Sequence, residues 1–122
     1  MRLTSGIDLV EIKRIRQSLQ HPRFLTRVFS DEERKFFQEK KVSVQTIAAN
    51  FCAKEAFSKA LGTGIRGFAL TDISVLRDPL GAPYFSFQGK AKEIVEQRNL
   101  TLSVSLTHTE EYAAAVVTAL EG

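Results

Sequence analysis

Residues 43–62 read SVQTIAANFCAKEAFSKALG, and this stretch predicts the longest helix of the chain. Ser43 is a favourable N-cap residue, and Gly62 suits the end of a helix because glycine adopts a left-handed backbone without strain. We therefore expect the helix to run over residues 44–61. Its apolar residues recur at helical spacing and predict one buried face, made of Ile47, Ala48, Phe51, Cys52 and Ala56.

The residues before this helix predict a strand followed by short helices. Residues 3–10 alternate well enough for a first strand, with Asp8 near its end. From Glu11 the apolar spacing becomes helical, and Pro22 breaks that helix. A short helical turn follows, and the sequence SDEE at residues 30–33 then forms a capping box that opens another helix.

The residues after the long helix predict strands. A turn joins predicted strands at 71–77 and 83–88, a short helix follows at 90–98, and 100–106 is the clearest strand. One face of that strand carries Leu100, Leu102, Val104 and Leu106. Residues 112–120 predict the last strand, although their many alanines leave a helix as the alternative. We expect an α+β fold, in which an N-terminal strand and helices pack on an antiparallel sheet.

Size and composition favour one domain in a reducing compartment. The chain of 122 residues suits a single domain over residues 1–122, and 43% of its residues are hydrophobic. One cysteine excludes an internal disulfide. No apolar run is long enough for a membrane span, and the first residues lack the apolar stretch of a secretory signal. A cytoplasmic protein without a membrane partner is therefore expected.

Positive charge is concentrated in the first half of the chain. Residues 1–61 hold 12 basic and 7 acidic side chains, whereas residues 62–122 hold 5 basic and 7 acidic ones. An acid-free stretch at 12–30 includes the basic residues Lys13, Arg14, Arg23 and Arg27. This stretch is either a docking face for a negative partner or a solvated helix face. A nucleic-acid surface would need more charge and interleaved aromatic residues, so no nucleic acid is expected.

Two carboxylates lie where an acid needs a partner. Asp8 follows apolar residues in the first strand, and Glu55 lies in a nearly apolar part of the long helix. Mg²⁺ is one candidate partner, because it takes one or two protein carboxylates and completes its shell with water and phosphate oxygens. Ion pairs of Asp8 with Lys54 and of Glu55 with Lys59 are the alternative.

Lys59 and the glycines after it could line one groove with Glu55. On a helix, Glu55 and Lys59 are four residues apart and share a face, and Gly62 lies three residues further on. Lys59 could neutralise a phosphate, while the backbone of Gly62, Thr63 and Gly64 could approach it closely. A helix C-cap followed by a turn explains the same glycines equally well.

His108 and Cys52 are two further reactive side chains. His108 follows the strand at 100–106, where it could contact a phosphate, act as a base or have a structural role. Cys52 has apolar neighbours, so we expect a small buried side chain rather than a nucleophile. The sequence shows no Ser/His/Asp set and no zinc-ligand spacing.

Three segments together resemble a known family. They read GIDLVEIKRI at 6–15, FCAKEAFSKALGTGI at 51–65 and VSLTHTEEYA at 104–113. Over essentially its full length the chain resembles holo-[acyl-carrier-protein] synthase, the small bacterial type of 4′-phosphopantetheinyl transferase. The run KEAFSKALGTG is its most specific part. One departure is Asn50, which stands where many relatives have a basic residue.

The resemblance implies a metal-dependent transferase. Such an enzyme moves the 4′-phosphopantetheine arm of coenzyme A to a serine of apo-acyl carrier protein, releases adenosine 3′,5′-bisphosphate and supports fatty acid biosynthesis. Asp8 and Glu55 are implied as ligands of Mg²⁺, with Mn²⁺ as an open alternative. Glu55 or a metal-bound water would accept the serine proton, and Lys59 would stabilise charge on the pyrophosphate.

The resemblance also implies contacts with substrates and with other subunits. Family members are homotrimers with active sites between subunits. The coenzyme A site would include Lys59, Gly62, Thr63, Gly64 and His108. The acidic carrier protein would dock on Lys13, Arg14, Arg23 and Arg27. The rival hypothesis is a non-catalytic binding module with the same basic face, and it leaves the two carboxylates and Lys59 without a purpose.

Overall fold

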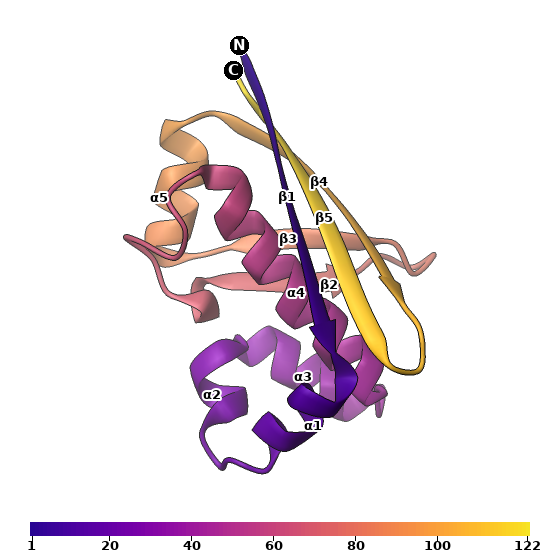
Figure 1. Cartoon of the computed structure of the whole chain (residues 1–122). Coiled ribbons are helices and arrows are strands. Elements are labelled where there is room, and N and C mark those ends of the chain that lie inside the picture. Colours follow the sequence, from indigo (N-terminus) through magenta and orange to yellow (C-terminus); the bar gives the residue numbers. More distant parts are fainter.

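A computed structural model describes all 122 residues and confirms the α+β class (Figure 1). Along the chain the elements are β1 (Arg2–Glu11), α1 (Ile12–Leu19), α2 (Phe24–Val28), α3 (Asp31–Glu39), α4 (Val44–Leu61), the 3₁₀ turn η1 (Leu70–Asp72), β2 (Ile73–Arg77), β3 (Pro83–Phe87), α5 (Gly89–Gln97), β4 (Leu100–His108) and β5 (Tyr112–Glu121). Figure 1 shows α4 running behind β1 and β5, with α1, α2 and α3 gathered at one end. None of these helices combines the length and apolar character that a bilayer span requires.

The strands form two separate antiparallel sheets. β5 is the central strand of the first sheet, with β1 on one side and β4 on the other. β2 and β3 form a two-stranded ribbon of their own. The prediction that the strand begins at residue 71 was wrong by two residues, because Thr71 and Asp72 belong to η1. There the Asp72 carboxylate accepts a hydrogen bond from the Ala69 N–H at 3.3 Å, which holds the backbone in a turn.

The helix predicted at 44–61 is present, but it is buried on more than one face. Ser43 Oγ accepts a hydrogen bond from the Thr46 N–H at 3.3 Å, and Gly62 ends the helix with φ of 81°. Ile47 and Phe51 of the predicted stripe are only half-buried. The sheet covers one side of α4, while Phe57 on another side packs against rings of β3. Because α4 lies between two layers, burial also reaches the polar residues Asn50, Lys54 and Ser58.

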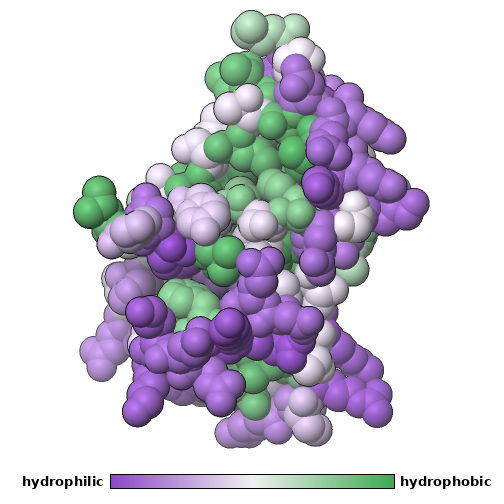
Figure 2. Space-filling view, turned by 180° about the vertical axis from the view of Figure 1, so that it is seen from behind, coloured by the Kyte–Doolittle hydropathy of each residue, from purple (hydrophilic) through white to green (hydrophobic).

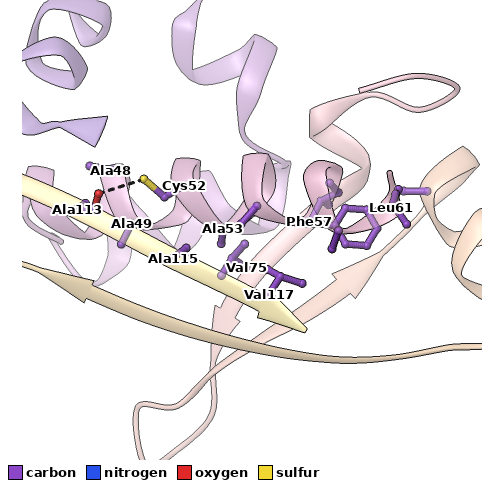
Figure 3. Packing of buried hydrophobic residues seen from close by; sticks show 14 of the residues in the cluster. Ala48, Ala49, Cys52, Ala53, Phe57, Leu61, Val75, Ala113, Ala115 and Val117 are labelled. Atoms are coloured by element: carbon purple, nitrogen blue, oxygen red, sulfur yellow. Dashed lines mark hydrogen bonds between the residues drawn. The ribbon is translucent and has the colours of Figure 1, made fainter. Parts of the chain in front are cut away.

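β5 is a strand in spite of its alanines. Its alternate residues Ala113, Ala115, Val117 and Ala119 are buried against α4, as Figure 3 shows for the first three. Small side chains on both elements let the helix approach the sheet closely. Pairing with β1 and β4 satisfies the backbone of β5 on both edges, which outweighs the helix propensity of alanine.

The apolar face predicted for β4 is present and only partly covered. Leu100, Leu102, Val104 and Leu106 are half-buried, while the residues between them are exposed. A groove of about 430 Å³ remains between β3, α5 and β4. Figure 2, which views the molecule from behind, shows an apolar area bordered by hydrophilic side chains.

Candidate active site

Gly6 brings Asp8 close to α4. A methyl group at Gly6 would overlap the carbonyl of Ala56 and lie 2.7 Å from the Ala60 nitrogen. Thr4, on the same face of β1, donates a hydrogen bond from Oγ1 to the Ala60 carbonyl at 2.8 Å. Since alternate residues of a strand share a face, Asp8 also points toward α4, and its side chain is only 17% exposed.

Lys59 pairs with Asp8. Its Nζ lies 3.2 Å from Asp8 Oδ1 and donates a further hydrogen bond to the Ile7 carbonyl at 3.0 Å. The Lys59 side chain is still 56% exposed, so an external anion can reach the ammonium. The alternative ion pairs considered from sequence were therefore wrong: Lys54 pairs with Glu33, and Glu55 forms no ion pair.

Glu55 lies close enough to Asp8 for their charges to repel. Burial raises the pKa of the Glu55 carboxyl, the negative charge of Asp8 raises it further, and Lys59 opposes both effects. Burial and then Asp8 also raise the pKa of the nearby Cys52 thiol. Cys52 Sγ donates a hydrogen bond to the Ala113 carbonyl at 3.4 Å (Figure 3). As predicted, Cys52 is a buried side chain, and it is held in the neutral thiol form.

The Asp8–Glu55 pair has the composition of a site for a hard cation. Lys59 pairs with Asp8 alone, so the charge of the two carboxylates is incompletely balanced. Both carboxylates offer the oxygen ligands that Mg²⁺ and Mn²⁺ prefer. No group of three or more His, Cys, Asp or Glu side chains is placed to hold a metal ion. Mg²⁺ usually keeps several waters and binds substrate phosphates, so two protein ligands fit this metal.

The glycine loop after α4 borders a second groove. Gly62 and Gly64 have φ of 81° and 67°, and the Gly62 N–H donates a hydrogen bond to the Lys59 carbonyl at 3.0 Å. The groove, of about 620 Å³, is lined by Gly62, Thr63, Arg66, Gly67, Ile94 and Arg98. Gly62 is thus a C-cap and also lines a groove, and two guanidinium groups that were not singled out from sequence lie beside it.

His108 lies apart from Asp8 within one chain. It is the last residue of β4, rather than the residue after the strand, and it is opposite Ala113 of β5. β5 separates β4 from β1, which carries Asp8. The His108 side chain is exposed and makes no hydrogen bond within the chain, so it is free to contact another molecule.

The four basic residues proposed for docking are exposed. Lys13 and Arg14 lie on α1, whose buried residues face the other way, and Arg23 and Arg27 lie at the two ends of α2. None of the four forms an ion pair within the chain, so their charges are available to a partner. A groove of about 350 Å³ is lined by Ser18, His21, Pro22, Arg23, Phe24, Arg27 and Val28.

A buried polar cluster behind Glu55 was missed from sequence. Lys54 and Glu33 form an ion pair in which both side chains are fully buried. Asn50 donates hydrogen bonds to Glu33 Oε2 and to the Val75 carbonyl, both at 2.9 Å, and accepts one from Arg77 at 2.8 Å. Asn50 therefore faces inward and cannot contact a phosphate. The capping box reveals Glu33 in the sequence, but its burial depends on α4 and β2, which are distant in the chain.

Comparison with known proteins identifies the family. The model of the 4′-phosphopantetheinyl transferase superfamily matches residues 5–117, a range that contains both carboxylates, Lys59 and His108. The chain belongs to this superfamily, and it is therefore an enzyme. Within the superfamily, a holo-[acyl-carrier-protein] synthase of Clostridium botulinum is 42% identical over 115 residues, covering 92% of this chain and 94% of that protein.

Solved structures support the same relationship. The crystal structure of the holo-[acyl-carrier-protein] synthase of Neisseria meningitidis superimposes with a TM-score of 0.88 at 34% identity, covering 97% of this chain and 98% of that one. The Helicobacter pylori synthase in complex with coenzyme A gives a TM-score of 0.82 at 34% identity, covering 95% and 99%. The resemblance inferred from three sequence segments thus extends over the whole fold.

Proposed function

We propose that this enzyme transfers 4′-phosphopantetheine from coenzyme A to a serine of apo-acyl carrier protein. The observation that carries the proposal is the meeting of Asp8, Glu55 and an accessible Lys59 at the β1–α4 contact. The names of the relatives and the coenzyme A held by one related structure support the choice of substrates. The single domain over residues 1–122 would carry the whole reaction.

Asp8 and Glu55 would hold Mg²⁺, with Mn²⁺ as the alternative. When bound, the metal would supply positive charge against the pyrophosphate of coenzyme A. The support for this assignment is chemical: the two carboxylates, of which Asp8 is only 17% exposed, repel each other, and Lys59 offsets this repulsion only in part.

In the reaction we propose, Glu55 accepts the proton of the carrier-protein serine. Its carboxylate lies beside Asp8 and Lys59 at the β1–α4 contact, where an ionised carboxylate can act as a general base. The serine oxygen forms a bond to the β-phosphorus, and the bond from that phosphorus to the bridging oxygen breaks. Adenosine 3′,5′-bisphosphate leaves, and Lys59 Nζ stabilises the charge that develops on the pyrophosphate oxygens.

Coenzyme A would bind between subunits of a homotrimer. Gly62, Thr63 and Gly64 would contact it from the subunit that supplies Lys59, and His108 would contact it from a neighbouring subunit, since one chain keeps His108 away from Asp8. Exposed apolar side chains on the outer face of β1 support an assembly: Leu3 is 68% exposed, Ile7 67% and Leu9 65%.

The acidic carrier protein would dock on the basic face of α1 and α2. Four cations, Lys13, Arg14, Arg23 and Arg27, lie there and form no ion pair within the chain, and the first turns of α1 and α2 contain no acid. This arrangement favours a negatively charged partner. We assign the reaction to fatty acid biosynthesis in the cytoplasm. The single free and buried cysteine is consistent with that reducing compartment.

A mass-spectrometric assay tests the proposed function. The protein is mixed with apo-acyl carrier protein, coenzyme A and Mg²⁺, and the carrier protein should gain the mass of one phosphopantetheine arm. A carrier protein whose acceptor serine is replaced by alanine is the control and should gain nothing. If the intact carrier protein from the same cell stays unmodified, the binding-module hypothesis replaces this proposal.

A further inference from the structure

The Lys54 side chain connects three segments of the chain around one ammonium group. It is fully buried, and its Nζ donates hydrogen bonds to the Val28 carbonyl at 2.7 Å and to the Leu70 carbonyl at 2.9 Å. The third partner of Nζ is the carboxylate of Glu33, and the ring of Phe29 lies 5.1 Å away. Val28 is the last residue of α2, so its carbonyl has no later turn of helix to bond with.

Glu33 is fixed as firmly as Lys54. Its Oε1 accepts a hydrogen bond from the Ser30 N–H at 3.1 Å, and its Oε2 accepts from Asn50 at 2.9 Å and from the Val75 N–H at 3.3 Å. No buried side-chain nitrogen or oxygen of the chain lacks a partner. A buried ion pair with every donor and acceptor occupied cannot shift without breaking several bonds at once, so it holds the ammonium in one place.

α2 is the shortest α-helix of the chain. It has five residues and none of them is fully buried. Phe24 packs edge to face against Phe29 at 5.8 Å and lies against Phe51 of α4, with ring centroids 6.3 Å apart. The hydrogen bond from Lys54 adds a polar link from the backbone of α2 to the interior of α4. It joins Val28, the neighbour of Arg27, to the residue that precedes Glu55.

We propose that the Lys54–Glu33 pair is a positioning device that sets the distance between the docking helix α2 and the catalytic carboxylate Glu55. The inference rests on the proposed function. A carrier protein held by Arg23 and Arg27 can present its serine to Glu55 only if α2 and α4 keep a fixed separation. A displacement of about 1 Å between reacting groups can cost on the order of 100-fold in rate. Lys54 therefore acts on transfer to the carrier protein and leaves coenzyme A binding unchanged.

The test removes both charges and compares the result with a matched exposed pair. Glu33→Gln keeps an oxygen for the Ser30 N–H, and Lys54→Met keeps the volume of the buried stem, so neither charge of the pair is left buried without the other. The control is Lys90→Met with Glu93→Gln, the same two exchanges in an exposed pair on α5 whose charged atoms are 3.4 Å apart.

Hydrogen exchange without substrates is the first measurement. The amides of Arg27 and Phe29, which bond to Arg23 and Leu25 within α2, should exchange faster in E33Q/K54M, while the α4 amides keep their protection. The control pair should change neither. Unchanged protection of α2 in E33Q/K54M would overturn the positioning role. Because no substrate is present, this result is independent of whether the unaltered protein transfers phosphopantetheine, which the mass assay decides.

Kinetics of the same variant form the second measurement. The kcat/KM for carrier protein should fall at least about tenfold, while the KM for coenzyme A stays within about twofold. Arg27→Ala should lose most of its effect in the E33Q/K54M background, whereas Arg14→Ala, on α1, should add its full effect. Equal changes for both substrates, or additive effects of Arg27→Ala, would contradict the proposal. If E33Q/K54M does not fold, both measurements are made on Lys54→Arg instead. This variant keeps the positive charge but places it at a different distance from the Val28 carbonyl, so the same results are expected.

Discussion

The fold favours the neutral form of Glu55, whereas the proposed chemistry needs its ionised form. Burial and the charge of Asp8 both disfavour its ionised form, and Lys59 compensates only in part. A group whose pKa is raised by folding stabilises the folded chain at pH below its unfolded pKa, and that contribution is lost as the pH rises through the folded pKa. At neutral pH without metal, the charged Glu55 therefore costs stability. We attribute this cost to the site's need for a cation.

Glu55→Gln should separate stability from activity. In metal-free buffer at pH 7 the variant should have a higher Tm than the unaltered protein. The difference in Tm should vanish below about pH 4, where Glu55 is protonated and neutral like the glutamine that replaces it. Adding Mg²⁺ should raise the Tm of the unaltered protein by mass action and leave the variant unchanged. Thermal unfolding across pH and Mg²⁺ concentration measures all three effects.

The same variant should have lost transfer activity, by a factor of at least about 100 if Glu55 acts only as the base. Loss of a metal ligand adds to that factor. Near-normal transfer by Glu55→Gln, measured with carrier protein and coenzyme A, would mean that both roles are misassigned. Lys59→Met is the comparison variant, because it removes the positive charge beside Asp8 and keeps both carboxylates.

The contact between β1 and α4 is the element-level feature that forms the site. Asp8 and Glu55 are 47 residues apart in the chain, and they meet because Gly6 lets two backbones approach each other. A side chain at this position would separate the strand from the helix and with it the two carboxylates. The spacing between Asp8 and Glu55 is therefore set by a residue that carries no chemistry of its own.

Gly6→Ala should destabilise the fold and weaken the site. The added methyl group would overlap the Ala56 carbonyl, and overpacking of this kind costs about 1–3 kcal/mol. Denaturant unfolding should show the loss, and the Mg²⁺-dependent rise in Tm should shrink. Ser5→Ala is the comparison, because Ser5 is the neighbouring residue of β1 and its side chain is exposed. Equal Mg²⁺ responses in the two variants would argue against this account of β1.

The exposed basic side chains on α1 and α2 lead to a prediction about carrier-protein binding. Arg14→Glu with Arg23→Glu should raise the KM for carrier protein by at least about tenfold and leave the KM for coenzyme A nearly unchanged. The effect should shrink at high salt, because exposed charges are screened. Lys35→Glu with Lys92→Glu, at exposed positions on α3 and α5, makes the same change in net charge as a control. Equal shifts for both substrates would refute docking on this face.

Sequence patterns predicted local features well and long-range ones poorly. The bounds of α4, its two caps and the capping box at Ser30 depend on neighbouring residues, and all are present in the structure. The Lys54–Glu33 pair was missed because it joins two helices whose relative position no local pattern encodes. The sequence analysis selected Asp8, Glu55 and Lys59 as site residues. Only the fold shows that Lys59 forms its ion pair with Asp8 and not with Glu55.

At the scale of the whole molecule, one face of the first sheet is covered and the other is exposed. The inner face of the first sheet is covered by α4, whereas the outer face exposes Ile7 and, opposite it on β5, Val116. Leu3 and Leu9 extend the same apolar surface along β1. Surfaces of this kind are costly for a monomer in water and are typical of subunit contacts. An assembly through this face would also explain how His108, isolated in one chain, becomes part of a shared site.

Ile7→Asp should therefore dissociate the proposed homotrimer and abolish transfer. A charge at the centre of an apolar contact loses its hydration without gaining a partner, so association should weaken by several orders of magnitude if three such contacts are disrupted together. Light scattering on a sizing column should report a monomer, with a circular dichroism spectrum unchanged from that of the unaltered protein. Leu80→Asp is the matched control, because Leu80 is 96% exposed in the turn between β2 and β3, which form a sheet separate from that of β1. If Ile7→Asp remains a trimer, assembly through the outer face of β1 is refuted. If the unaltered protein is itself a monomer, the shared active site is refuted, and His108 then has no place in the coenzyme A site.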